Sequence, residues 1–185
     1  NLMIYDILVP FVLVGLAELG DKTQLAILVL STKIKEHKTL LLGVMLAFMI
    51  TDGIAILFGN YIAQAVPLDY VKLVSGLIFI FFGVMILKNS DEDDENGTYE
   101  LKNPFVSGFG IVLVSEMGDK TQLAAALFAT QYNPLLVFVG VMLALLLLST
   151  LTIYLGKVII KKVNTKIVSK VAGILFILIG ASFLI

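Results

Sequence analysis

The sequence predicts an all-α membrane protein with six transmembrane helices, arranged as two inverted three-helix repeats. Three observations predict this fold class: an apolar composition, six long apolar stretches, and a motif that occurs twice. Of the 185 residues, 59% are hydrophobic and 15% are charged, and the mean hydropathy is +1.02. Soluble domains are nearer half apolar and a quarter charged, and one small core cannot bury this much apolar surface. The composition therefore excludes a soluble enzyme, a disordered tail and a nucleic-acid-binding protein.

Six stretches have the roughly 20 mostly apolar residues that a transmembrane helix needs. They cover residues 7–30, 40–66, 70–87, 104–130, 134–160 and 167–185. Pro67, Pro104 and Pro134 fall at their boundaries, where a proline disturbs a helix least. No basic stretch precedes the first apolar run, so we expect a retained span rather than a signal peptide. The expected product is a multi-pass integral protein of the lipid bilayer.

Lysines predict how this protein is oriented. Those near the loops after the first, third and fifth spans are Lys33, Lys35, Lys38, Lys88, Lys102, Lys157, Lys161, Lys162, Lys166 and Lys170. The opposite side carries only Lys72. Because short cytoplasmic loops are enriched in lysine and arginine, we expect these three loops to be cytoplasmic and both termini to lie outside.

A nine-residue motif occurs twice, as ELGDKTQLA at residues 18–26 and EMGDKTQLA at residues 116–124. Eight of the nine positions match, and GVMLA also recurs, at residues 43–47 and 140–144. This similarity predicts a duplicated three-helix unit. Because three is an odd number, the second copy enters the membrane in the opposite orientation, as in transporters that bind their substrate near the midplane.

The duplication predicts one membrane domain in two parts. Residues 1–88 form the first repeat, residues 89–103 an acidic cytoplasmic linker, and residues 104–185 the second repeat. The linker sequence around Glu92, Asp94 and Asn96 partly resembles a calcium-binding EF-hand loop, but the twelfth position is Asn103 rather than Glu. A solvated linker is therefore the favoured interpretation.

The motif acids occupy the middle of two predicted spans. They are Glu18 and Asp21 in the first span, and Glu116 and Asp119 in the fourth. A charge at the centre of a bilayer costs at least about 2.5–3.5 kcal/mol. We therefore expect these carboxylates to face one another, water or an ion.

Oxygen atoms are the expected ligands of any metal, because the chain has no cysteine and one histidine. If each motif is a continuous helix, its two acids lie three residues apart on one face, and a glutamine three residues further on joins them. The predicted metal ligands are Glu18, Asp21, Gln24, Glu116, Asp119 and Gln122. Gly20 and Gly118 permit a local break that would add backbone carbonyls. Such a set suits Ca²⁺, Mn²⁺ or Mg²⁺, and a dehydrating site favours Ca²⁺ or Mn²⁺ because Mg²⁺ releases its waters reluctantly.

A cluster of four empty carboxylates repels itself and tends to hold protons. An entering metal would expel those protons, and returning protons would expel the metal. This competition is a physical basis for exchanging a cation for protons. The alternative is purely structural, with salt bridges from Glu18 to Lys22 and from Glu116 to Lys120 at the i,i+4 spacing.

The twin motif resembles the mark of the calcium/manganese cation–proton antiporters, which include the Golgi manganese transporter linked to glycosylation and its chloroplast and yeast relatives. Their pattern is Glu-x-Gly-Asp-(Lys/Arg)-(Thr/Ser) once in each half of a six-span protein, and it stands here at residues 18–23 and 116–121. The resemblance covers nearly the whole chain. It implies that the motif acids are the metal and proton sites, that Thr23 and Thr121 assist them, and that Mn²⁺ and Ca²⁺ are the transported substrates with no prosthetic group.

Four further residues are candidates for a secondary site or a gate. Lys22 and Lys120 lie within the motifs. Asp52 lies inside the second span, where its counterpart in the other repeat is Ser149, and it is equally well explained as a proton relay or as a lone buried acid. Ser115 stands where the first repeat has Ala17. His37, the single histidine, is expected to be a surface residue.

The favoured function is a secondary transporter that exchanges a divalent cation for protons and exports the metal from the cytoplasm. An exporter of a small organic cation, such as a basic amino acid, is the alternative within transport. An intramembrane aspartyl protease built on Asp21 and Asp119 is the alternative from another class, but it leaves both glutamates and both lysines unexplained. The sequence leaves the oligomeric state open.

Overall fold

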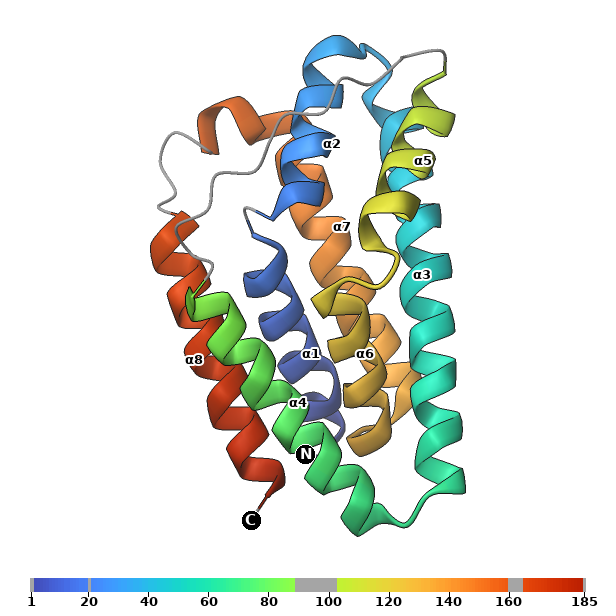
Figure 1. The fold of residues 1–185 in the computed structure, drawn as a ribbon. Coiled ribbons are helices and arrows are strands. Elements are labelled where there is room, and N and C mark those ends of the chain that lie inside the picture. The colour runs from blue at the N-terminus through green and yellow to red at the C-terminus, as the bar shows by residue number, and fades with distance from the viewer. Residues whose placement is uncertain (1, 20, 89–102, 160–164, 185) are drawn as a thin grey trace.

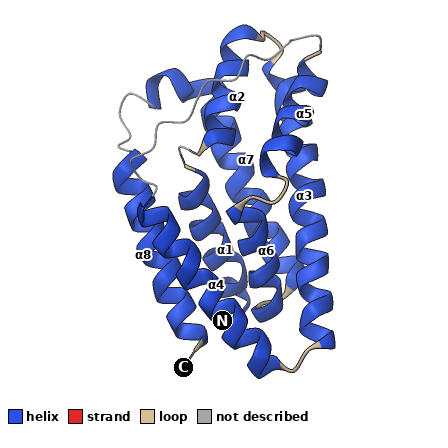
Figure 2. Cartoon of the chain, in the orientation of Figure 1, coloured by secondary structure: helices blue, strands red, loops and turns tan. Residues whose placement is uncertain are grey.

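The computed structural model describes residues 2–19, 21–88, 103–159 and 165–184, and within them all regular structure is helical (Figure 2). The predicted first repeat contains α1 (Leu2–Glu18), α2 (Lys22–Lys33), α3 (His37–Ala65) and α4 (Leu68–Lys88). The second contains α5 (Pro104–Glu116), α6 (Lys120–Gln131), α7 (Pro134–Ile159) and α8 (Thr165–Phe183). The predicted all-helical class is confirmed. The acidic linker, with its EF-hand-like segment, lies outside the described residues.

Two of the predicted spans are broken. The first predicted span is divided into α1 and α2, and the fourth into α5 and α6. The axes of Met3–Glu18 and Lys22–Lys33 differ by 67°. A local break, which the motif glycines are expected to permit, is therefore present at each motif, and the continuous helix that a shared face for the two acids requires is not, because each motif ends one helix and begins the next.

Among the described residues, α3 (His37–Ala65) and the Pro134–Leu155 part of α7 are each long and apolar enough to cross a membrane alone. The bent pair α1–α2 makes a third such span if its two helices are counted together. Shorter apolar helices cover Lys72–Phe81, Pro104–Glu116 and Gly173–Phe183. Helix length and composition thus support two to three spans, and the other predicted spans stay predictions.

Corresponding helices of the two halves make corresponding contacts. The α1–α7 packing has its counterpart in α3–α5, and α2–α7 has its counterpart in α3–α6. Close approach occurs at equivalent glycines, since Gly43 lies against the backbone of Phe105 and Gly140 against that of Ile7. Small residues allow helix backbones to approach in this way.

Helices α4 and α8 form the most extensive helix pair and lie side by side along one edge of the bundle (Figure 1). The buried rings of Phe79 on α4, Phe128 on α6 and Phe176 on α8 form an aromatic cluster, with centroids 4.8 Å apart for Phe79 and Phe128 and 5.4 Å apart for Phe79 and Phe176. This cluster joins the α4–α8 pair to the broken helices. The two breaks lie near the middle of the bundle, and both chain ends lie at one end of it (Figure 1).

Candidate metal centre

The two motifs end one helix and begin the next at equivalent residues. Glu18 and Glu116 are the last residues of α1 and α5, and Asp21 and Asp119 are the N-caps of α2 and α6. The N-cap angles agree closely, with φ −70° and ψ 163° at Asp21 and φ −73° and ψ 162° at Asp119. Each glutamate therefore stands at a helix C-terminus, where free carbonyl groups attract cations. The aspartate of the same motif lies on the other side of the break, at the start of the next helix, and therefore does not share a helical face with the glutamate.

Gly118 makes the second break possible. Its φ of +83° lies in the left-handed region that side chains other than glycine rarely adopt. Its N–H donates to Oε1 of Gln122 at 2.7 Å, which ties the break to the first turn of α6. The equivalent residue, Gly20, lies outside the described residues.

Three of the four motif acids form one cluster. One carboxylate oxygen from each of Glu18, Glu116 and Asp119 lies within 4.8 Å of the other two. Glu18 is 0% exposed and Glu116 is 1% exposed. Both oxygens of Glu18 and one of Glu116 are buried without a hydrogen-bond partner among the described residues. Buried carboxylates without partners are costly, so these oxygens call for a proton or a cation.

The fourth acid, Asp21, is engaged elsewhere. Its Oδ1 accepts a hydrogen bond of 2.6 Å from Nζ of Lys120, in the other motif. The reciprocal pair joins Nζ of Lys22 to Oδ1 of Asp119 at 3.6 Å. The i,i+4 bridges of the structural alternative, from Glu18 to Lys22 and from Glu116 to Lys120, are not among the ion pairs of the described residues, in which both lysines pair with aspartates.

The two predicted glutamine ligands bind other protein groups. Oε1 of Gln24 accepts a hydrogen bond of 2.9 Å from the Thr152 hydroxyl on α7. Besides its bond from Gly118, Gln122 donates through Nε2 to the backbone carbonyl of Thr51 on α3, at 3.1 Å. The glutamines therefore attach the second half of each broken helix to a long helix.

The motif threonines lie beside the carboxylates. Thr121 is buried, and its hydroxyl lies 3.4 Å from Oε2 of Glu116 and 3.4 Å from Oδ2 of Asp119. Thr23 is also buried, and its hydroxyl has no partner among the described residues. Ser115 is half-buried at the end of α5. The sequence analysis did not single out Thr51 and Thr152. Their only distinguishing feature in the sequence is that they are polar residues within apolar spans.

Asp52 and Ser149 occupy equivalent places on α3 and α7. Asp52 is 2% exposed and Ser149 is 0% exposed, and each has a buried side-chain oxygen without a partner among the described residues. Asp52 directly follows Thr51, whose carbonyl oxygen accepts the hydrogen bond from Gln122 of the second motif. The structure therefore brings Asp52 near the cluster. At the equivalent position of α7, Ser149 offers a hydroxyl group in place of a carboxylate.

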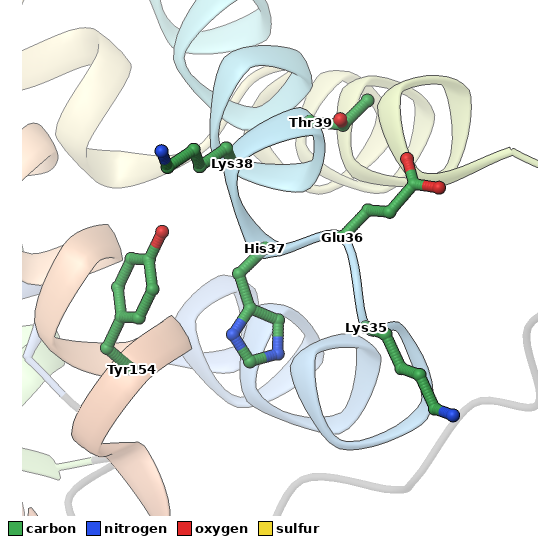
Figure 3. A pocket seen from close by; sticks show the side chains of 6 residues that line it. All are labelled: Lys35, Glu36, His37, Lys38, Thr39 and Tyr154. Atoms are coloured by element: carbon green, nitrogen blue, oxygen red, sulfur yellow. The ribbon is translucent and has the colours of Figure 1, made fainter.

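A separate hollow of about 440 Å³ lies where α2 meets α3, lined by Lys35, Glu36, His37, Lys38, Thr39 and Tyr154 (Figure 3). His37 is half-buried rather than a surface residue. Its Nε2 lies 3.1 Å from the carbonyl oxygen of Ser31, and its ring meets that of Tyr154 edge-on at 5.4 Å. The side chains of Lys35 and Glu36 point away from the histidine (Figure 3). The hollow holds none of the motif residues.

Helices broken at buried acids, within an apolar bundle, define an integral membrane transporter of cations. Residues 6–94 and 104–185 match the model of the divalent cation/proton antiporter GDT1 family, and the chain belongs to that family. The family is one of transporters, which excludes the protease alternative.

Individual relatives agree with this membership. The chain is 31% identical over 169 residues to a Vibrio cholerae protein named "Putative manganese exporter", covering 90% of this chain and 84% of that protein. It is 24% identical over 204 residues to GDT1-like protein 5 of Oryza sativa, covering 89% and 88% of the two chains. A 57-residue segment is 46% identical to the chloroplastic PAM71-homolog of Arabidopsis thaliana, covering 31% of this chain and 16% of that protein. No solved structure matches the chain.

Proposed function

We propose that this protein exchanges Mn²⁺ or Ca²⁺ for protons at a site formed by both motifs, and that it exports the metal from the cytoplasm. The cluster of Glu18, Glu116 and Asp119 carries this proposal. It combines three hard oxygen ligands, deep burial and carboxylate oxygens that have no protein partner. Such a cluster suits divalent cations that prefer oxygen ligands.

The spacing of the cluster fits a single divalent ion. Oxygens bound to Ca²⁺ at about 2.3–2.6 Å lie at most about 5 Å apart. The three carboxylate oxygens, all within 4.8 Å of one another, fit that limit. Mg²⁺ is disfavoured because the buried site requires it to lose water. The Vibrio cholerae relative is named as a manganese exporter, which favours manganese as the substrate and export as the direction.

Competition between metal and protons couples the two fluxes. An empty cluster of carboxylates at this depth has to hold protons, because unpaired charges repel one another and are poorly solvated. A divalent cation neutralises the same oxygens and displaces those protons. Metal affinity is therefore expected to fall as the pH falls, and a proton gradient directed inward drives the metal outward.

The proposed topology has six crossings in two inverted repeats. The corresponding contacts α1–α7 and α3–α5 support a two-fold relation between the halves, with the two breaks near its axis. The side with most lysines is taken as cytoplasmic. This orientation places the acidic linker in the cytoplasm and both termini outside, in keeping with their position at one end of the bundle (Figure 1).

Flux in proteoliposomes tests the proposal. Vesicles are loaded with a pH-sensitive dye, Mn²⁺ or Ca²⁺ is added outside, and the wild type is compared with Glu18→Gln and Asp119→Asn. We expect metal uptake with proton release in the wild type and a loss of at least about 100-fold in either variant. Glu36→Gln, an exposed acid at the start of α3 with no side-chain capping bond, is the matched control and should transport normally.

Each outcome has a distinct meaning. Metal uptake without proton movement would reject exchange and leave a uniporter or a channel. Absence of both metal flux and metal binding in the folded wild type would reject the carboxylate site altogether. Normal transport by Glu18→Gln would place the cation elsewhere.

A further inference from the structure

The lysine of each motif pairs with the aspartate of the other motif, and these two pairs are unequal. Lys120 also lies 4.0 Å from Asp119 in its own motif, a longer contact than the one it makes with Asp21. Lys120 approaches Asp21 to 2.6 Å, while Lys22 and Asp119 are 3.6 Å apart. The Lys120 side chain is 18% exposed, whereas that of Lys22 is 50% exposed. One pair is thus tight and mostly buried, and the other is loose and half open.

The backbone angles at the two N-caps do not account for this difference. Asp21 and Asp119 have N-cap angles that agree within a few degrees, and both begin helices of the same length. The motif sequences differ at one position, Leu19 against Met117. Because each motif supplies the same aspartate and lysine, the reverse arrangement, with Lys22 tight on Asp119 and Lys120 loose, uses the same two kinds of group.

The pairing determines which aspartate can serve the cation. Asp119, with the loose lysine, contributes an oxygen to the cluster with Glu18 and Glu116. Asp21, held by Lys120, does not. In the reverse arrangement Asp119 would be held and Asp21 would join the two glutamates. Three carboxylates would then face the cation in both arrangements, but a different aspartate would complete each set.

We propose that Lys22 and Lys120 are positioning residues that act in alternation, each withdrawing the aspartate of the opposite motif from the cation in one of the two access states. This inference rests on the proposed function. Exchange of the tight pair accompanies the change of the side to which the site opens, as expected when inverted repeats exchange conformations. By keeping one carboxylate away, the lysine also prevents four carboxylates from binding the ion too tightly to release it.

The two lysines should therefore control opposite sides of the membrane. We would prepare right-side-out and inside-out vesicles from an expression host and measure Mn²⁺-driven proton movement in each. The variants are Lys120→Gln and Lys22→Gln, with Lys120→Arg and Lys22→Arg as controls that retain the charge. Maximal rate and half-saturating Mn²⁺ are compared separately for the two sides.

We expect Lys120→Gln to lower the half-saturating Mn²⁺ concentration at least fivefold from one side only, with a maximal rate at least tenfold lower. Lys22→Gln should do the same from the other side, and both arginine variants should stay within about threefold of the wild type. Effects confined to the same side, equal effects from both sides, or a higher half-saturating concentration would overturn the inference. If the wild type itself moves no protons with Mn²⁺, the proposed function fails instead.

A double variant covers the case in which a neutral lysine variant does not fold. Asp21→Asn/Lys120→Gln removes both charges of the tight pair and leaves the cluster of Glu18, Glu116 and Asp119 intact. We expect this double variant to bind Mn²⁺ in detergent with a Kd within about threefold of the wild-type value, and to transport at least tenfold more slowly. Mn²⁺ binding weakened beyond threefold would show that the tight pair belongs to the cation site itself and would overturn the inference.

Discussion

Gly76 of α4 and Gly180 of α8 lie directly against each other's backbone. A Cβ added to Gly76 would lie 2.7 Å from the carbonyl oxygen of Gly180, and one added to Gly180 would lie 2.6 Å from that of Gly76. The same reciprocal approach joins Gly83 to Gly173. Four glycines, rather than large side chains, thus set the distance between α4 and α8 at two levels.

We predict that Gly180→Ala destabilises the protein by about 1–3 kcal/mol, because the added methyl group has to push two helix backbones apart. Thermal unfolding in detergent, followed by circular dichroism, measures the effect. Gly110→Ala on α5 is the matched control, because a Cβ there meets nothing within 4 Å. Equal unfolding temperatures for the two variants would contradict the close packing of α4 on α8.

At the second break, Gly118→Ala is predicted to weaken Mn²⁺ binding at least tenfold. The space around Gly118 is open, so the cost comes from its φ of +83° and not from a clash. Relief of that strain would move Glu116 relative to Asp119. Gly118→Asn should bind better than Gly118→Ala, because asparagine tolerates positive φ more readily. Calorimetric titration with Mn²⁺ ranks the variants, and an alanine variant that binds as well as the asparagine variant would refute this explanation.

Mn²⁺ is expected to raise the unfolding temperature of the wild type, since a ligand at about 100 times its Kd stabilises a folded protein by about 2.7 kcal/mol. Glu18→Gln should lose this shift, because it removes a charge whose two oxygens have no partner among the described residues. Glu36→Gln should keep it. Scans with Mn²⁺ and with a chelator provide the comparison, and a full shift in Glu18→Gln would remove Glu18 from the site.

Asp52→Asn is predicted to slow transport about tenfold while leaving the Mn²⁺ Kd within about threefold of the wild-type value. Asp52 is buried near the cluster but lies outside it, so it suits the movement of protons better than the binding of metal. Ser149→Ala, at the equivalent position of the other half, is the control and should transport normally. If both variants transport normally, Asp52 is a buried acid without a part in the exchange.

Much of the architecture follows from the sequence because its causes are local. Apolar runs predict helices, and the helix ends at Ala65 and Pro134 agree with the expected boundaries within about two residues. The repeated motif singles out the residues that form the carboxylate cluster. The expected shared helical face of Glu18 and Asp21 is wrong, because periodicity assumes a continuous helix and cannot reveal a break inside an apolar run.

The sequence on its own therefore establishes an apolar helical chain in two related halves, with acids buried in each half, because hydropathy and repetition can be read along the chain. Tertiary structure decides which of these acids meet. Lys120 pairs with Asp21 although 99 positions separate them, and that pairing leaves Glu18, Glu116 and Asp119 as the cluster. The motifs are nearly identical in sequence, so no local property distinguishes the two aspartates. Their difference arises only where the two halves pack together and each lysine reaches across to the other motif.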